Sequence, residues 1–394
     1  MEIFSAHAPS GEVTGIPIFV TTSMRGDIRN THWTSLCASR IVIADTSYTD
    51  GKFTGGCMPA STSSSKIFHR SVDDALGPRN KRFFGDGYKR AEHNLRDITV
   101  TEDPGRSPRI DASVRVRYPS DWSRKGDKDQ RPHLSTVDVL VIGAQLCEVL
   151  LVDAVGLTAQ ELSKAVLSRA RIKAGTTPVE DDLEGFAASA RLVSTSPAPG
   201  EVGRFVSTMD CRVGTLRMTC TVHHGRAAGA RSLPVRHASG RMAFTDPHLR
   251  LFGTGFTTRQ QFVEDVELDP ASNRAIAAVR INEAVQAPAA GIEAGLRECA
   301  SPIDAFVIGL QLGQILLYAL DNVPRSRSNT LWMRETVLEL DPARAALPAL
   351  QGTTARLERS RQLTNSRGEV WRSADIVGEF HGIGLRCSVA HRLP

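Results

Sequence analysis

The chain has 394 residues, of which 41% are hydrophobic and 23% charged, and its formal net charge is +5. These values are typical of a globular protein, and the length allows two to three domains. The positive charge is scattered and accompanied by few aromatic residues, which disfavours a nucleic-acid partner. No apolar run reaches the ~18 residues that a membrane span needs, so we expect no membrane partner.

The start of the chain lacks the features of a secretory signal. Ile16–Val20 is too short for the apolar core of such a signal, and no basic segment precedes it. The cysteines lie far apart, at positions 37, 57, 147, 211, 220, 299 and 387, without metal-ligand spacing. We therefore expect buried reduced thiols, a cytoplasmic location and no metal or other cofactor.

Residues 1–70 are rich in Ser, Thr and Gly and predict a poorly ordered extension, with candidate short strands at Ile16–Thr21 and Arg40–Ala44. Further along, residues 109–118 alternate between apolar and polar side chains, which predicts a half-buried strand. Ser135–Val155 is apolar on nearly all sides and therefore predicts a buried helix.

Three blocks of the sequence occur twice, in the same order. The pairs are Phe84–Tyr88 with Phe252–Phe256, Ser135–Leu151 with Ser301–Leu317, and Cys220–His224 with Cys387–His391. Their offsets are 168, 166 and 167 residues. A register kept over three separated blocks indicates a duplicated domain.

The duplication predicts a first copy at 71–224, a linker at 225–242 and a second copy at 243–394. The last strand of each copy is expected at 216–222 and 383–389, where apolar and polar residues alternate. A buried helix early in each copy, followed by several strands, favours an α+β fold. Its specific form would be a double hotdog, two antiparallel sheets each wrapped around a central helix.

Each predicted helix carries an aspartate and a glutamine seven residues apart on one face, Asp138 with Gln145 and Asp304 with Gln311. A buried carboxylate costs several kcal/mol unless it is paired or hydrogen-bonded. Each aspartate could cap its own helix, because Ser135 stands three residues before Asp138 in capping-box spacing. The alternative is an acid–base or substrate-orienting role.

The copies also differ in ionisable groups: His93 aligns with Gln261, His133 with Cys299, Glu148 with Gln314, and Lys173 with Glu339. A duplicated protein with two original sites could thus have kept one in the first copy, although each residue alone could be a satisfied or solvated side chain. The candidate catalytic residues are His133, Asp138 and Asp304, and the candidate substrate-binding residues are His93, Gln145, Lys173, Gln311, Arg82 and Lys89.

The two Phe-Gly-x-Gly-aromatic loops lack the strand and helix context of a nucleotide-binding motif and predict turns with an aromatic side chain in the core. The first loop is flanked by basic residues, which could meet a phosphate or lie in solvent; they are Arg79, Lys81, Arg82, Lys89 and Arg90. His224 and His391 end the last strand of each copy on its inner face, which favours a packing role.

Several strings resemble the AvrD family of bacterial avirulence proteins. They include Ser71–Asp74 with Leu76–Gly77, Arg82–Arg90, Tyr118–Ser123, Arg131–Ser135 and Lys173–Pro178, and they lie in the family's order. The resemblance spans about residues 71–393 and is strongest in the first copy.

The resemblance implies transfer of a β-ketoacyl group from a thioester to a sugar-like polyol, as in syringolides, or to dihydroxyacetone phosphate in butenolide signals made by proteins similar to the A-factor synthase group. An acyl carrier protein is a further implied partner. The helix start also resembles the Asp-x-x-x-Gln region of polyketide dehydratases, but the spacing here is seven residues and the dehydratase histidine motif is absent.

We therefore expect an acyltransferase that makes a small signalling or secondary metabolite. The alternatives are a double-hotdog thioesterase or dehydratase and a non-catalytic acyl-ligand-binding protein. The chain could be a monomer that forms an internal pseudo-dimer, or a homodimer.

Overall fold

The computed structural model describes residues 65–101, 105–126, 128–175, 179–180, 182–225, 236–237, 246–283 and 289–394. The candidate strands at 16–21 and 40–44, and most of the expected linker, lie outside these ranges. Ser64–Pro394 forms one compact unit. Within the described ranges, five cysteines are buried and free, as expected: Cys147, Cys211, Cys220, Cys299 and Cys387.

The first half of this unit, up to residue 237, contains the predicted helix at 135–155 and the predicted strands at 109–118 and 216–222. Its helices are α1 (Val72–Leu76), α2 (Thr136–Asp153) and α3 (Ala159–Ser163). Its strands are β1 (Ile67–Ser71), β2 (Glu92–Thr101), β3 (Arg109–Arg117), β4 (Arg124–Lys125), β5 (Lys128–Asp129), β6 (Val166–Lys173), β7 (Phe186–Pro197), β8 (Arg204–Val213), β9 (Leu216–Gly225) and β10 (Arg236–His237).

The second half has one long helix, α4 (Pro302–Asp321), within the described residues. Its strands are β11 (Arg259–Asp269), β12 (Arg274–Glu283), β13 (Trp332–Leu340), β14 (Gln351–Thr364), β15 (Val370–Phe380) and β16 (Ile383–Arg392). Short 3-10 turns complete the described chain at Arg79–Lys81, Gly87–Arg90, Pro247–Leu249, Gly255–Thr258, Ala294–Leu296 and Arg325–Arg327.

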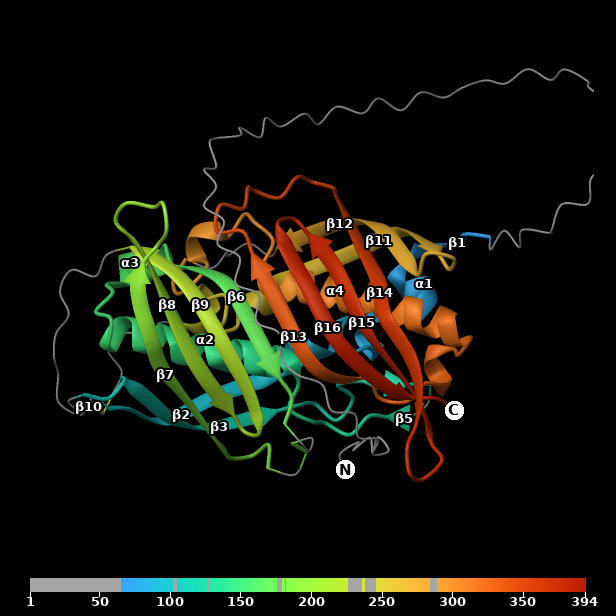
Figure 1. Cartoon of the computed structure of the whole chain (residues 1–394), viewed down its shortest axis with the longest axis horizontal. Helices are drawn as coiled ribbons and strands as arrows, with labels where there is room; N and C mark the ends of the chain where they lie inside the picture. Colours follow the sequence, from blue (N-terminus) through green and yellow to red (C-terminus); the bar gives the residue numbers. More distant parts are fainter. Residues whose placement is uncertain are drawn as a thin grey trace, which may run out of the picture. The chain divides into compact units, whose positions relative to one another are not determined.

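The predicted antiparallel pairing is confirmed, but the two sheets expected from the sequence are joined into one, because β6 of the first half pairs with β13 of the second. Fourteen strands of the described chain form one sheet in the order β1-β11-β12-β14-β15-β16-β13-β6-β9-β8-β7-β3-β2-β10. Read outward from the β13–β6 pair, both halves have the same succession of strands. Figure 1 shows α2 against the strands of the first half and α4 against those of the second. The boundary expected at residue 70 falls inside β1, which pairs with β11 of the second half.

The two halves meet where β6 pairs with β13. Arg171 faces Val337 at the centre of this pairing, with Lys173 opposite Glu335 and Arg169 opposite Glu339. Arg171 and Val337 are 166 residues apart, which is the offset of the two helix blocks in the sequence. A residue facing its own equivalent is what a two-fold relation between the halves requires.

Both predicted core helices are confirmed, and each begins with a capping box. The Ser135 side chain accepts a hydrogen bond from Asp138 N while the Asp138 carboxylate accepts from Ser135 N. Ser301 and Asp304 make the same reciprocal pair at the start of α4. Such caps supply partners for backbone amides that the first turn of a helix leaves unbonded.

In the described chain, α4 is the one helix long and apolar enough to qualify as a membrane span by length and composition, although the sequence predicted none. Of its most apolar stretch, 83% is buried inside the protein. These are the features of a core helix surrounded by sheet.

The glycine loops place their aromatic residues in the core, as predicted: Phe84, Tyr88, Phe252 and Phe256 are all buried. A side chain at Gly85 would collide with the carbonyl oxygen of Arg79. The chain therefore closes this turn only because glycine has no Cβ.

Each glycine loop packs against the helix of the other half. Arg82 Nη1 in the first loop donates to Gln311 Oε1 on α4 at 2.6 Å. In return, Gln145 Nε2 on α2 donates to the carbonyl oxygen of Phe252 at 2.7 Å. The core of each half is therefore closed by a segment of the other.

A further cross-contact between the halves is a buried ion pair. Arg250 Nε donates to Glu148 Oε2 at 2.9 Å, and Ile292 N donates to Glu148 Oε1 at 2.9 Å. Both side chains are at least 96% buried. Burial raises the pKa of Glu148, against the opposing effect of Arg250. A buried pair of this kind tolerates the loss of neither partner, because the other would remain as an uncompensated charge.

We predict that Glu148→Gln, which introduces the residue found at position 314, lowers the free energy of unfolding by about 3–5 kcal/mol because Arg250 loses its counter-charge. Urea denaturation followed by circular dichroism measures the loss. The control is Glu201→Gln at an exposed pair, expected to change stability by less than about 0.5 kcal/mol. Equal effects of the two substitutions would show that the cross-contact does not hold the halves together.

Candidate active site

Asp138, at the start of α2, is the centre of a buried polar network. Its Oδ1 lies 2.7 Å from His93 Nε2, from β2. Its Oδ2 accepts from Ser135 N at 2.7 Å, from Ser135 Oγ at 2.5 Å and from the hydroxyl of Tyr118. The carboxylate is therefore held by four donors from three segments of the first half.

This network keeps the carboxylate charged. Burial alone would raise the pKa of Asp138, but the hydrogen bond and charge of His93, with the hydrogen bonds of Ser135 and Tyr118, outweigh it and lower the pKa. Burial, reinforced by the charge of Asp138, raises the pKa of Tyr118 well above its usual value. Tyr118 therefore remains a neutral hydroxyl donor, and Asp138 an anion with its lone pairs in use.

His133 lies beside this network and, like Tyr118, is only partly buried. Its backbone carbonyl oxygen lies 3.0 Å from the Tyr118 hydroxyl, whose single proton is shared between this oxygen and the closer Asp138 carboxylate. Its ring lies between Trp122 and Trp332, with ring centroids 5.3 and 5.4 Å away. Trp332 belongs to the second half, so residues of both halves form the walls around His133.

The tautomer of His133 follows from its contacts. Nδ1 lies 3.2 Å from the carbonyl oxygen of Arg131, which can only accept, so this nitrogen carries the proton in the neutral ring. Within the described chain Nε2 has no hydrogen-bond partner. Burial lowers the pKa of His133, which keeps the ring neutral near pH 7. An unprotonated, available Nε2 is the requirement for a general base.

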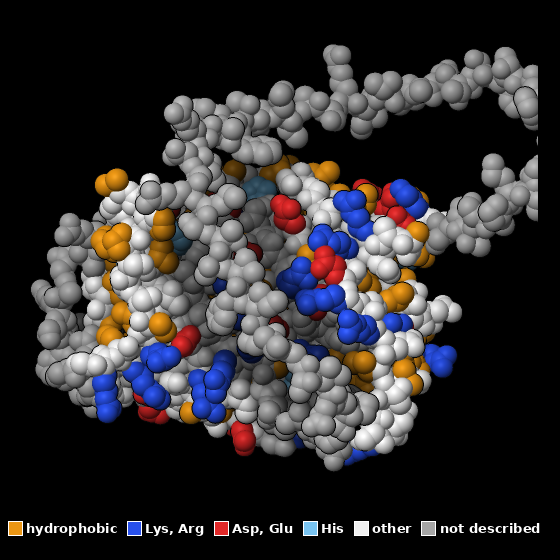
Figure 2. All heavy atoms as spheres, in the orientation of Figure 1, with side chains coloured by type: hydrophobic (Ala, Val, Ile, Leu, Met, Phe, Trp, Pro, Cys, Tyr) orange, Lys and Arg blue, Asp and Glu red, His pale blue; other side chains and the backbone are white. Residues whose placement is uncertain are grey.

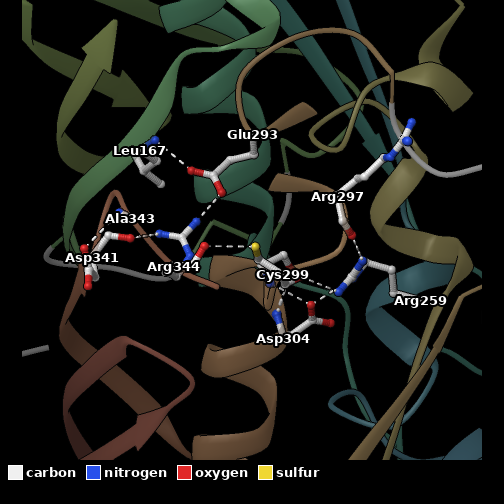
Figure 3. A network of polar contacts seen from close by, with 10 residues as sticks. Leu167, Arg259, Glu293, Arg297, Cys299, Asp304, Asp341, Ala343 and Arg344 are labelled. Atoms are coloured by element: carbon white, nitrogen blue, oxygen red, sulfur yellow. Dashed lines mark hydrogen bonds and ion pairs between the residues drawn. The ribbon is translucent and has the colours of Figure 1, made fainter. Parts of the chain in front are cut away.

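The equivalent place in the second half has different chemistry (Figure 3). Arg259 Nε donates to Asp304 Oδ2 at 2.8 Å, and Gln261 Nε2 donates to Asp304 Oδ1 at 2.6 Å. Arg259 also donates to the carbonyl oxygens of Arg297 and Cys299. Burial acts to raise the pKa of Asp304, but Arg259, Gln261 and Ser301 lower it overall. A permanent cation fixes this carboxylate, and none of its side-chain partners can exchange a proton near pH 7.

The alignment of His93 with Gln261, and of His133 with Cys299, therefore describes equivalent positions in space. His93 binds Oδ1 of Asp138, and Gln261 binds Oδ1 of Asp304. Tyr118, which binds Oδ2 of Asp138, lies 3.0 Å from the carbonyl oxygen of His133, and Arg259, which binds Oδ2 of Asp304, donates to the carbonyl oxygen of Cys299. In the first half both positions hold an imidazole, whereas the second half has an amide and a thiol there.

The remaining predicted site residues lie elsewhere. Gln145 and Gln311 are used in the cross-contacts between the halves. Arg82 binds Asp73 as well as Gln311, and Lys89 Nζ lies 3.3 Å from Asp86 Oδ1. Burial lowers the pKa of both Arg82 and Lys89. These residues do not join the Asp138 network.

Lys173 lies on the outer face of the sheet, where its Nζ is 3.9 Å from Glu335 Oε1. Figure 2 shows Lys and Arg side chains beside Asp and Glu side chains on the molecular surface. The structure thus separates Lys173 from His133 and Asp138, because Lys173 follows the buried Ile172 and so points to the opposite face.

Sequence reasoning missed Tyr118, Trp122 and Arg259 as members of these sites. Tyr118 shares the parity of the apolar residues in the alternating segment 109–118, and Tyr118 and Trp122 stand in one of the strings that resemble the AvrD family. Both signals were present. For Arg259 there was none, because its partner Asp304 lies 45 residues away.

Among the described residues, no group of three or more His, Cys, Asp or Glu side chains could hold a metal ion. Each helix start has one buried carboxylate. Asp138 is bound by histidine and tyrosine side chains, and Asp304 by arginine and amide side chains.

Comparison with known proteins gives one family match. The family model described as Pseudomonas avirulence D protein (AvrD) matches residues 66–394. No curated protein matches the chain.

Among solved structures, a putative oleoyl thioesterase from Lactobacillus plantarum is 11% identical with a TM-score of 0.36, covering 73% of this chain and 96% of that one. The 12:0-ACP thioesterase from Umbellularia californica is 12% identical with a TM-score of 0.33, covering 72% and 94%. The dehydratase domain of RzxB from Pseudomonas fluorescens is 13% identical with a TM-score of 0.29, covering 75% and 95%. Because these TM-scores are low, the description of the fold rests on the strand order and helices of the chain itself.

We predict that Asp304→Asn destabilises the protein more than Asp138→Asn does. The first leaves the buried guanidinium of Arg259 without its counter-ion, which costs about 3–5 kcal/mol. The second weakens a helix cap and the hydrogen bonds that the Asp138 carboxylate accepts, without leaving a guanidinium unpaired, which costs about 1–3 kcal/mol. Urea denaturation of both variants at neutral pH compares them, and a larger loss for Asp138→Asn would contradict the assignment of the fixed ion pair to the second half.

The lowered pKa of Asp138 also predicts a pH dependence. The stabilisation from this carboxylate is complete above its unfolded pKa of about 3.9 and is lost as the pH falls through the folded value. The difference in unfolding free energy between the native protein and Asp138→Asn should therefore be constant from about pH 5 to 8 and shrink below about pH 4. A difference that grows on acidification would show that the folded protein favours the protonated acid.

Proposed function

The chain belongs to the family of the Pseudomonas avirulence D protein (AvrD), and from this premise we propose that it transfers a β-ketoacyl group from a thioester to a hydroxyl of a sugar-like acceptor. The product would be an ester that leads to a small signalling or secondary metabolite of the syringolide or butenolide kind. The family implies the substrates, and the geometry around His133 supplies the chemistry.

We further propose that the two halves are hotdog repeats, and that the chain is a double hotdog. The identical strand order on the two sides of the β6–β13 pair supports this, as does the central helix of each half. In such an arrangement the two halves of one chain would act as the two subunits of a dimer.

The available Nε2 of His133 is the single observation that carries the proposed reaction. A neutral imidazole with a free nitrogen, half-buried between two indole rings, can remove the proton from an acceptor hydroxyl. The resulting alkoxide attacks the thioester carbonyl, and the thiolate leaves with the proton returned by the imidazolium. One C–O bond forms and one C–S bond breaks, so no oxidant, metal or cofactor is needed.

Asp138 and His93 are assigned as positioning residues. The two oxygens of Asp138 are occupied by donors, which disfavours Asp138 as the base itself. The Tyr118 hydroxyl lies between this carboxylate and the carbonyl oxygen of His133, which places it in contact with the segment that carries the imidazole. Asp304 would have the corresponding structural role in the second half without a catalytic one.

We predict that His133→Gln reduces turnover about 10²–10⁴-fold, the usual contribution of a general base, while the protein remains folded. Purified protein is incubated with a medium-chain β-ketoacyl thioester and xylulose, phosphorylated xylulose or dihydroxyacetone phosphate, and the products are identified by mass spectrometry. His223→Gln, a half-exposed histidine on β9, is the matched control and should retain full activity.

Other products would identify the alternative functions. Free β-keto acid without an ester would indicate a thioesterase, with water in place of the acceptor, and an unsaturated thioester would indicate a dehydratase. A thioester that binds and stays intact with every acceptor would identify a non-catalytic acyl-ligand-binding protein. Each of these results would refute acyl transfer to these acceptors.

A further inference from the structure

A second cluster of polar groups lies at the far end of α4, where a segment of the first half crosses to the second. Lys125 on β4 donates from Nζ to Ser328 Oγ at 3.2 Å and to the carbonyl oxygen of Asn329. Both acceptors follow the turn Arg325–Arg327. The ammonium group thus binds only neutral oxygens within the described chain.

Arg325 on the same turn is half-buried and has no carboxylate partner among the described residues. Beneath it lies Tyr318, which is 8% exposed. The Tyr318 hydroxyl has no hydrogen-bond partner in the described structure, although Ser328 lies close to it. A buried hydroxyl without a partner is uncommon and calls for an explanation, such as a missing ligand.

The charges around the cluster are not balanced. Arg82 and Lys125 each lie near enough to Arg325 for its charge to disfavour their own. The nearest acid on α4, Asp321, is bound by Arg372, with Nε at 3.0 Å. The carboxylate that binds Arg82 is that of Asp73, whose side chain is 41% exposed.

The equivalent positions of the two halves differ in negative charge. Arg250, the equivalent of Arg82, binds the buried carboxylate of Glu148. The residue equivalent to Glu148 is the neutral Gln314. Helix α2 of the first half therefore carries a buried anion for the arginine of the second, whereas α4 carries a neutral glutamine at that position and Arg82 is paired with the partly exposed Asp73.

The pKa values of Lys125 and Arg325 are lowered, as expected where nearby negative charge is lacking. Burial, reinforced by the charge of Arg325, lowers the pKa of Lys125 to about 7. Burial also lowers the pKa of Arg325. A bound anion would restore the charge of Lys125, because an opposite charge nearby favours the charged form.

We propose that Lys125, Arg325 and Tyr318 form a binding site for a phosphoryl group. The two half-buried cations would form charge-assisted hydrogen bonds to phosphate oxygens, and the Tyr318 hydroxyl would donate a third. The nearby charge of Arg82 would add to the positive potential at this site. The site differs from the one predicted from the sequence, which relied on Lys173 and on the basic residues around Gly85.

The location connects this site to the proposed reaction. Trp332, whose ring contacts His133, follows Asn329 by three residues, a span of roughly 10 Å in extended chain. On the proposed function, the phosphoryl group would belong to the acceptor or to the phosphopantetheine arm of the acyl donor. Binding of phosphate itself does not depend on that function.

Isothermal titration calorimetry of the full chain with inorganic phosphate, phosphorylated xylulose and phosphopantetheine tests the proposal. Arg325→Gln and Lys125→Met should each weaken phosphate binding about tenfold or more, the loss of one charge-assisted contact. Tyr318→Phe, which keeps the ring, should weaken it about threefold to tenfold. The matched control is Arg327→Gln, on the exposed side of the same turn, which should leave the affinity unchanged.

Loss of affinity in the three variants, with the control unchanged, would support the site, and the compound that suffers the larger loss would identify the source of the phosphoryl group. Absence of saturable phosphate binding, or an equal loss in Arg327→Gln, would overturn it. Acyl transfer to unphosphorylated xylulose by a protein that binds no phosphate would leave the proposed function standing. Phosphate binding that depends on these residues, without transfer to any acceptor, would instead overturn the proposed function alone.

Discussion

The structure depends on one constraint: the sheet of each half lies against its own helix, but a loop from the other half completes the cover. The glycine loop of each half lies against the helix of the other, and the buried pair of Arg250 with Glu148 fixes one of these exchanges. A buried charge without its partner is far costlier than an exposed one. The two halves therefore stabilise each other, and the continuous β6–β13 pairing joins them in one sheet.

The same arrangement explains how the halves could diverge. Asp138 and Asp304 each complete a capping box at a helix start. Both acids therefore have a structural role that does not depend on the other side chains around them. Around this aspartate one half has an arginine and an amide, which fix the carboxylate as an ion pair, and the other has a histidine and a tyrosine. A duplicated fold can confine its chemistry to one half, because the other needs only to keep the shared core closed.

Much of the fold followed from local patterns. The helix blocks, the alternating strands and the capping serines depend on residues close in sequence, and the three repeated blocks fixed the equivalence of His93 with Gln261. The site was only partly predictable, because its contacts join distant segments. Strand parity could have placed Lys173 on the outer face, next to the buried Ile172. No local pattern could have paired Arg259 with Asp304, or Lys125 with Asn329.

The central claim is that the chemistry belongs to the first half alone, although both helices begin with a buried aspartate. A crystal structure with a non-reactive β-ketoacyl thioester analogue tests this most directly. The account predicts one analogue for each chain, with its thioester carbonyl beside His133 at the start of α2. An analogue bound at the start of α4 beside Asp304, or one at each helix, would contradict it.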